Sequence, residues 1–330
     1  MKVSFLPFFS MQDKRTGKFL YHKEGACTQF AFFADRVQSE LGWATRVLLP
    51  DPRLCVDYHA ISLRFPQSDV TVGYVPLDNR VQRMHWDTKL LLEATDGADV
   101  AVCQHEFLAI PLRVLRPKLR IVQWCIVDPV PRPLFDAAWD AADLVVHKYP
   151  AGVGSVWPMA YDEAKYPQLP VGAGERTIDV LFLPRCSADN CTHHLEAVEA
   201  GVKYFTDPTH YLKTHPEGEG LEYVDRYSTA LRSAKVVVSL REDAYGGVAI
   251  REAVRCGCVP VLLCTEAHER LAGSDWPLFV DRPEPTLIAE TVCRALQANV
   301  GCVEMQRRVA QESYQASWET VKRDLEALCL

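Results

Sequence analysis

A carboxylate and two adjacent glycines stand close together in the second half of the chain. Glu252 lies five residues after Gly247 in the segment 236–263, VVVSLREDAYGGVAIREAVRCGCVPVLL, where an apolar run, a glycine turn, a short helix and a second apolar run follow one another. One carboxylate can accept hydrogen bonds from both hydroxyls of a ribose, and the N–H groups of a turn at a helix N-terminus suit a diphosphate. The segment therefore predicts a nucleotide site.

Charged residues of the same half of the chain extend the candidate site. Either Arg251 or Arg185 could supply positive charge to a diphosphate. The candidate nucleotide-binding residues are Arg185, Asp243, Gly246, Gly247, Arg251 and Glu252. The alternative is that Glu252 is a solvated helix residue and that the glycines only turn the chain. The strand-like runs on both sides favour the nucleotide site, because nucleotides bind at the carboxyl ends of parallel strands.

Two residues in the first half of the chain are candidate general bases. Asp128 follows the apolar run RIVQWCIV (120–127), and His105 follows DVAVC (99–103). Either group, within one hydrogen bond of a hydroxyl, could take its proton while that oxygen attacks another centre. Asp128 could instead be a turn residue before Pro129, and His105 a buried, hydrogen-bonded histidine. The sequence leaves these alternatives open.

The elements that must position these residues alternate along the chain. Strand-like runs occur at 2–8, 44–50, 71–75, 99–103, 120–127, 143–147 and 177–184, and helical patterns at 29–43, 225–234 and 305–330. Such alternation predicts an α/β fold with mostly parallel sheets. We predict two Rossmann-like domains facing a cleft, over 1–155 and 178–304, with a Pro- and Gly-rich linker at 156–177 and a C-terminal helix at 305–330.

Composition excludes several classes of protein. The 330 residues are 48% hydrophobic with a formal net charge of -7, which gives no global attraction to anionic membranes or nucleic acids. No apolar run reaches membrane-spanning length and no signal peptide is evident, so we expect a cytoplasmic protein with no membrane partner and reduced cysteines. A Rossmann oxidoreductase would need a GxGxxG motif after a strand, and the sequence contains none. Cys186, Cys191, His193 and His194 lack a second ligand pair at zinc-site spacing, so no zinc site is expected.

The C-terminal half resembles the donor-binding domain of GT-B glycosyltransferases. The resemblance lies in TIDVLFLPR (177–185), a following helix, and the segment SAKVVVSLREDAYGGVAIREAVRCGCVPVLL (233–263). It implies a GT-B fold, with the C-terminal helix packing back on the first domain. It also implies that Glu252 binds the ribose of a nucleotide-sugar and that the glycine turn faces the diphosphate. Retaining members keep a second Glu where this chain has Ala244, which favours inversion.

The whole chain has a looser similarity to the DNA β-glucosyltransferases of T-even phages, which glucosylate hydroxymethylcytosine. It lies in RIVQWCIVDPVPRP (120–133), in VWPMAYDEAKYP (156–167) followed by ERTIDVLF, and in the basic, Trp-containing C-terminal helix. It implies that Asp128 is the catalytic base and that a modified base in phage DNA is the acceptor. Candidate DNA contacts are the basic loop 14–29 and Arg80, Arg83, His85 and Trp86.

Together these observations predict an inverting glycosyltransferase that uses a UDP-sugar, UDP-glucose or similar, and a hydroxyl acceptor. No DxD-like acidic motif is present, so we expect no tightly bound metal ion. One alternative is a retaining enzyme that acts on a glycan, a lipid or a small molecule. Another is a non-catalytic module that binds a nucleotide-sugar or nucleic acid, which would keep Glu252 without needing Asp128.

Overall fold

The structure, a computed structural model, divides the chain into two compact units. It describes residues 1–6, 25–48, 69–71, 88–104, 108–125, 132–147, 155–158, 160–171, 176–182, 211–213, 228–240, 248–297 and 302–330. The described residues of the first unit lie within Met1–Ala160 and Tyr314–Leu330, and those of the second within Tyr161–Ser313. The described part of the predicted linker 156–177 therefore belongs to the second unit from Tyr161 onward.

The first unit contains a parallel sheet with the strand order β3-β2-β1-β4-β5-β6-β7. Its strands are β1 (Lys2–Leu6), β2 (Ala44–Leu48), β3 (Asp69–Thr71), β4 (Val100–Cys103), β5 (Arg120–Cys125), β6 (Leu144–His147) and β7 (Ser155–Val156). All four residues of the central strand β4 are buried. A strand covered on both faces needs apolar residues at successive positions, which explains why these segments are continuous apolar runs.

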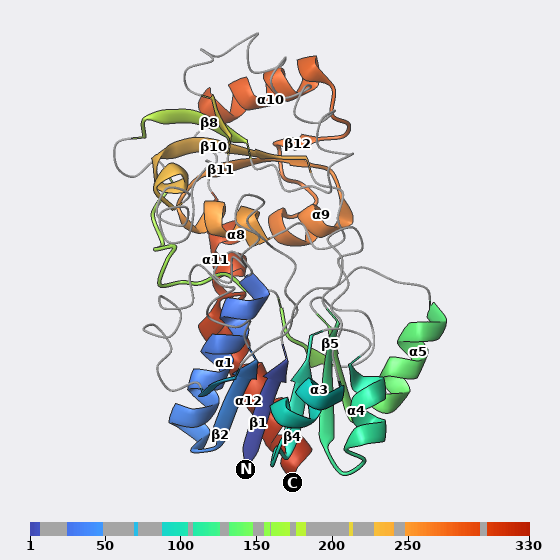
Figure 1. The fold of residues 1–330 in the computed structure, drawn as a ribbon. Coiled ribbons are helices and arrows are strands. Elements are labelled where there is room, and N and C mark those ends of the chain that lie inside the picture. Colours follow the sequence, from blue (N-terminus) through green and yellow to red (C-terminus); the bar gives the residue numbers. More distant parts are fainter. Residues whose placement is uncertain are drawn as a thin grey trace, which may run out of the picture. The chain divides into compact units, whose positions relative to one another are not determined.

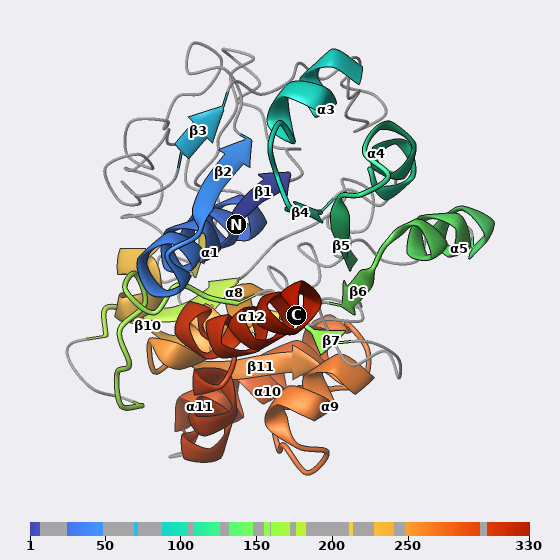
Figure 2. The ribbon, with the colours of Figure 1, turned by 90° about the horizontal axis from the view of Figure 1, so that it is seen from below.

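Helices cover both faces of this sheet (Figure 2). The helices α1 (Gly25–Leu41) and α12 (Tyr314–Cys329) pack on one face, with Val100 and Val102 of β4 in the same core cluster. The helices α3 (Thr88–Ala94) and α4 (Ala109–Leu115) pack on the other, with Ala101 and Cys103. Successive side chains of a strand point to opposite faces, so one short run fills both cores. The helix α5 (Arg132–Ala141) packs beside α4.

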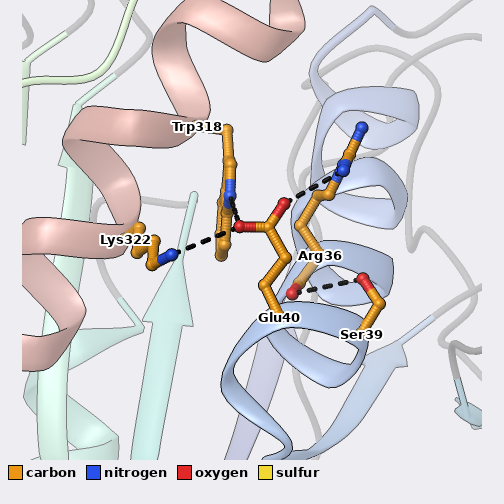
Figure 3. A network of polar contacts seen from close by, with 5 residues as sticks. All are labelled: Arg36, Ser39, Glu40, Trp318 and Lys322. Carbon is orange, nitrogen blue, oxygen red and sulfur yellow. Dashed lines mark hydrogen bonds and ion pairs between the residues drawn. The ribbon is translucent and has the colours of Figure 1, made fainter.

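Aromatic side chains join α12 to α1. The ring of Phe33 lies 6.3 Å from that of Trp318, 6.1 Å from that of Trp157 and 6.5 Å from that of Trp124. The indole of Trp318 also donates a hydrogen bond of 2.9 Å to Glu40, whose carboxylate pairs with Lys322 and Arg36 (Figure 3). The C-terminal helix therefore packs on the first unit, as predicted.

The second unit contains a parallel sheet with the order β12-β11-β10-β8-β9. Its strands are β8 (Ile178–Phe182), β9 (Tyr211–Lys213), β10 (Ala234–Ser239), β11 (Val259–Leu263) and β12 (Phe279–Val280). Figure 1 shows α10 (Pro285–Gln297) on one face of this sheet and α8 (Val248–Arg255) and α9 (Glu266–Ala272) on the other. The prediction of an α/β fold with parallel sheets is confirmed.

The segment 305–330 differs from its predicted form. It holds two helices, α11 (Val303–Ala310) and α12, separated at 311–313. The N–H of Gln311 bonds back to the carbonyl of Arg308 and the N–H of Glu312 to that of Val309, and Ser313 pairs with Tyr161 in an isolated β-bridge. The break lets α11 belong to the second unit and α12 to the first.

No helix within the described ranges is long and apolar enough to cross a membrane.

Candidate functional site

The helix α8 carries Glu252 and lies between the strands β10 and β11 in the chain. Its residues Ile250, Ala253 and Val254 are buried in the core of the second unit, and Glu252 is half-buried beside them. This spacing of three and four residues is that of a helix with one face on a sheet. The sheet and the apolar face of α8 thus fix the backbone that holds the Glu252 carboxylate.

The helix α8 ends at Arg255, and Gly257 follows in the turn after it. The N–H of Cys258 bonds to the carbonyl of Ala253 and the N–H of Gly257 to that of Val254, each at 3.0 Å, with Gly257 at a φ of 78°. This is the Schellman arrangement, which favours glycine because other residues rarely adopt such a φ. A Cβ at Gly257 would lie 2.6 Å from the carbonyl oxygen of Pro170. The position requires glycine both for its backbone conformation and for this close approach.

The negative charge of Glu252 acts on the thiol of Cys256, at the start of this turn. Burial, and then the charge of Glu252, raises the pKa of the Cys256 thiol to about 12. The thiol therefore stays protonated at neutral pH and is no candidate nucleophile. Within the described residues, no group of three or more His, Cys, Asp or Glu side chains is arranged to hold a metal ion.

Arg251 points away from solvent and is ion-paired. Its side chain is only 6% exposed, and its Nε atom donates a hydrogen bond to the Glu312 carboxylate, which is 28% exposed. A buried guanidinium requires such a partner, because an unpaired buried charge is strongly destabilising. Sequence reasoning missed Glu312, since 61 positions separate the two residues and no local pattern connects them.

The segment 160–171 packs along the C-terminal end of α8. The N–H of Leu169 bonds to the carbonyl of Arg255 at 3.0 Å. The Arg255 guanidinium donates to the carbonyl of Tyr166 at 3.3 Å and to the side-chain oxygen of Gln168 at 2.5 Å. It also lies 5.8 Å from the centre of the Tyr161 ring. Much of the predicted linker 156–177 therefore packs against the C-terminal end of α8.

Several predicted site residues lie outside the described residues. These are Asp128, His105, Arg185, Asp243, Gly246 and Gly247, together with the candidate DNA-contact residues Arg80, Arg83, His85 and Trp86. The strands that precede the two candidate bases are described: β4, before His105, pairs directly with β5, before Asp128, and Cys103 lies opposite Gln123. The strands β4 and β5 are therefore neighbours, and parallel α/β folds bind their ligands at the carboxyl ends of such strands.

Comparisons with known proteins connect this chain to one fold class. No family model matches the sequence, and no curated protein sequence matches it. Solved structures match over nearly the whole chain. HepE from Anabaena, in complex with UDP and glucose, matches with a TM-score of 0.64 and 13% identity, over 99% of each chain.

Two further structures have similar scores. AviGT4, a glycosyltransferase involved in avilamycin A biosynthesis, matches with a TM-score of 0.55 and 14% identity, over 100% of this chain and 98% of that one. The N-terminal domain of trehalose-6-phosphate phosphatase from Candida albicans has a TM-score of 0.60 and 10% identity, over 100% and 99%. The chain therefore has the α/β fold of GT-B glycosyltransferases. At these identities the likeness shows the fold alone.

Proposed function

We propose that this protein is a glycosyltransferase that takes a sugar from a nucleotide donor, a UDP-sugar such as UDP-glucose, and transfers it to a hydroxyl acceptor. The observation that carries the proposal is α8 in a GT-B fold, with Glu252 half-buried on a helix between the parallel strands β10 and β11. HepE, a structure of the same fold, holds UDP and glucose. A carboxylate at this place suits the two hydroxyls of a ribose.

The diphosphate of the donor needs positive charge where its own charge develops. Of the two arginines predicted for this role we favour Arg185, because Arg251 is buried and already bonded to Glu312. The N–H groups of the turn at Gly246 and Gly247 and the N-terminus of α8 would add their partial positive charge. Asp243 lies next to this turn in the sequence and is kept as a candidate contact to the nucleotide. No tightly bound metal ion is part of the proposal.

For the transfer step we propose Asp128 as the general base. It would remove the proton of the acceptor hydroxyl as that oxygen attacks the anomeric carbon, and the bond from that carbon to the diphosphate would break on the opposite side. This in-line displacement inverts the anomeric configuration. His105, which follows the neighbouring strand, is the rival base.

The proposed acceptor is a hydroxymethylated base in DNA. Support comes only from the sequence similarity to phage DNA β-glucosyltransferases around Asp128 and in residues 156–167. A glycan, a lipid or a small molecule remains the alternative acceptor, and a binding module without catalysis is the alternative class.

Two measurements, made one after the other, test the proposal. Calorimetry with UDP should detect binding by the wild-type protein, with about tenfold weaker binding by Glu252→Gln, since the neutral amide accepts hydrogen bonds less strongly than a carboxylate. Protein that binds no UDP or other nucleoside diphosphate would refute the nucleotide-sugar assignment.

The second measurement uses labelled UDP-sugars with hydroxymethylated DNA beside plain DNA. Label should enter only the modified DNA, and Asp128→Ala should keep UDP binding while turnover falls at least about a hundredfold. Full turnover by Asp128→Ala, with loss in His105→Ala, would assign the base to His105. UDP binding without transfer to any acceptor would instead identify a binding module.

A further inference from the structure

The pair formed by Arg251 and Glu312 connects α8 to the residues just before the chain returns to the first unit. The chain passes from the first unit to the second at Ala160–Tyr161 and returns at Ser313–Tyr314. Glu312 stands one residue before the return, and Arg251 stands one residue before Glu252. The ion pair therefore joins the helix that carries the candidate ribose-binding carboxylate to the end of the second unit.

Two further contacts hold these residues in the same structure. The N–H of Tyr161 bonds to the carbonyl of Glu312 at 3.3 Å, and Tyr161 forms a β-bridge with Ser313. The ring of Tyr161 in turn lies against the Arg255 guanidinium, one helical turn after Arg251. The α8 helix is thus bonded on two successive turns to the segments that begin and end the second unit.

The burial and charge of the Arg251 side chain explain how its ion pair with Glu312 could fix the orientation of α8. Arg251 is one of the buried residues of α8, and the Glu312 carboxylate offsets the charge of its guanidinium. Glu312 is partly exposed and follows the helix α11, whose Gln306 donates to the carbonyl of Val254 at 3.0 Å. Loss of the Glu312 charge would favour an outward shift of Arg251 toward water, which would rotate the backbone at Glu252.

We propose that Glu312, acting through Arg251, is a positioning residue for Glu252 that holds α8 in the orientation needed to bind the ribose of the donor. This inference rests on the proposed function, because it names how the chain orients the carboxylate of that same site. Neither residue needs to touch the donor for this role. In this role Arg251 supports nucleotide binding by holding the orientation of α8, and it does not contact the diphosphate.

The experiment compares Glu312→Gln with Asp179→Asn as a matched control. Asp179 of β8 pairs with Lys235 of β10 at 2.6 Å and is similarly exposed, at 21%, so its substitution removes a comparable ion-paired charge that joins two strands. Hydrogen exchange of the unliganded protein should speed up at the amides of Val248–Arg255 in Glu312→Gln and not in Asp179→Asn. Unchanged exchange at α8 in Glu312→Gln overturns the inference, whatever the protein binds.

A double-mutant cycle separates positioning from general loss of structure. Glu312→Gln should weaken UDP binding about tenfold in the wild-type background and by less than about twofold when Glu252 is already Gln, because contacting residues are not additive. An equal loss in both backgrounds overturns the inference. If Glu312→Gln does not fold, Arg251→Lys keeps a cation beside Glu312 and should show a smaller loss with the same dependence on Glu252.

These outcomes distinguish the inference from the proposed function. Wild-type protein that binds no UDP or other nucleoside diphosphate refutes the proposed function, and the exchange rates of α8 still decide whether Glu312 orients this helix. Wild-type binding with an unaltered affinity in Glu312→Gln leaves the proposed function standing and overturns the positioning role.

Discussion

The helix α12 of the first unit and the helix α8 of the second each have an apolar face in a core, but they differ in the contacts beside it: a buried aromatic cluster at α12 and two bonded arginines at α8. On α12 an aromatic residue, Trp318, is fully buried and packs its ring against Phe33, and its indole N–H bonds to Glu40. Around α8 the buried residues Ile250, Ala253 and Val254 face the core, and charged side chains add polar contacts, with Arg251 bonded to Glu312 and Arg255 bonded to the segment 160–171. Apolar packing is non-directional, whereas hydrogen bonds and ion pairs fix an orientation.

This difference matches what each helix has to do. The helix α12 closes the core of its unit, so it needs area of contact more than a particular rotation. The helix α8 presents a half-buried carboxylate, and a small rotation would turn Glu252 away from a bound ribose. We therefore expect substitutions around α12 to lower stability and substitutions around α8 to affect nucleotide binding as well.

The largest expected effect is that of Trp318→Ala. Removal of this fully buried ring leaves a cavity beside Phe33 and should lower the free energy of unfolding by about 3–5 kcal/mol. UDP affinity, measured below the unfolding transition, should stay within about twofold of wild type, since α8 lies in the other unit. The control is Trp139→Ala on α5, where the side chain is 38% exposed and the loss should stay below about 1 kcal/mol. Equal losses in the two variants would contradict the role of the aromatic cluster.

The next largest effect is expected at Gly257 of the second unit, with Gly97 of the first unit as its comparison. Gly257→Ala should cost about 3 kcal/mol, because alanine is strained at a φ of 78° and its Cβ would overlap the carbonyl oxygens of Pro170 and Leu169. Gly97→Ala in the first unit has a similar φ of 64° but nothing within 4 Å of the new Cβ, so it should cost only about 1 kcal/mol. Urea unfolding of both variants measures the difference. A smaller loss in Gly257→Ala than in Gly97→Ala would show that the segment 160–171 yields without cost.

The sequence predicted the regular parts of both units well, for a physical reason. Strands covered on both faces must be apolar at successive positions, so β1, β4, β5 and β10 are visible as short apolar runs. The sequence also places a glycine where a helix ends, as at Gly42, which follows α1 directly and has a φ of 67°. These features depend on local residues alone.

The features that sequence reasoning missed depend on contacts between distant residues. The helical pattern runs through Gln311 and Glu312, and the break there coincides with the bridge between Ser313 and Tyr161. The strands β9 and β12 have only three and two residues, too few to show a period. In the candidate site, the helix bearing Glu252 was predicted, but its ion-paired neighbour Arg251 was not distinguished from a free phosphate ligand.

The smallest expected effect is the pH dependence of stability that arises from Glu40, whose carboxylate bonds to Trp318 and Lys322 of α12. The hydrogen bond from Trp318, together with Lys322 and Arg36, holds the pKa of Glu40 below its ordinary value of 4.5 (Figure 3). A carboxyl whose pKa is lower in the folded state stabilises the protein above pH 4.5, and this contribution disappears as the pH falls through the folded-state pKa. Glu40→Gln should therefore lose less stability than wild type on acidification from pH 5 to pH 2, by under about 1 kcal/mol because the pair is partly exposed.

Urea unfolding of wild type and Glu40→Gln across that range measures the difference, and Glu93→Gln is the matched control. Glu93 pairs with Lys89 across one helical turn at 3.9 Å, and its side chain is 59% exposed, against 27% for Glu40. Its removal should leave the pH dependence nearly unchanged. If the Glu40 and Glu93 variants respond alike, the polar edge of the α12 contact adds nothing to the aromatic cluster, and the orientation of α12 is set by apolar packing alone.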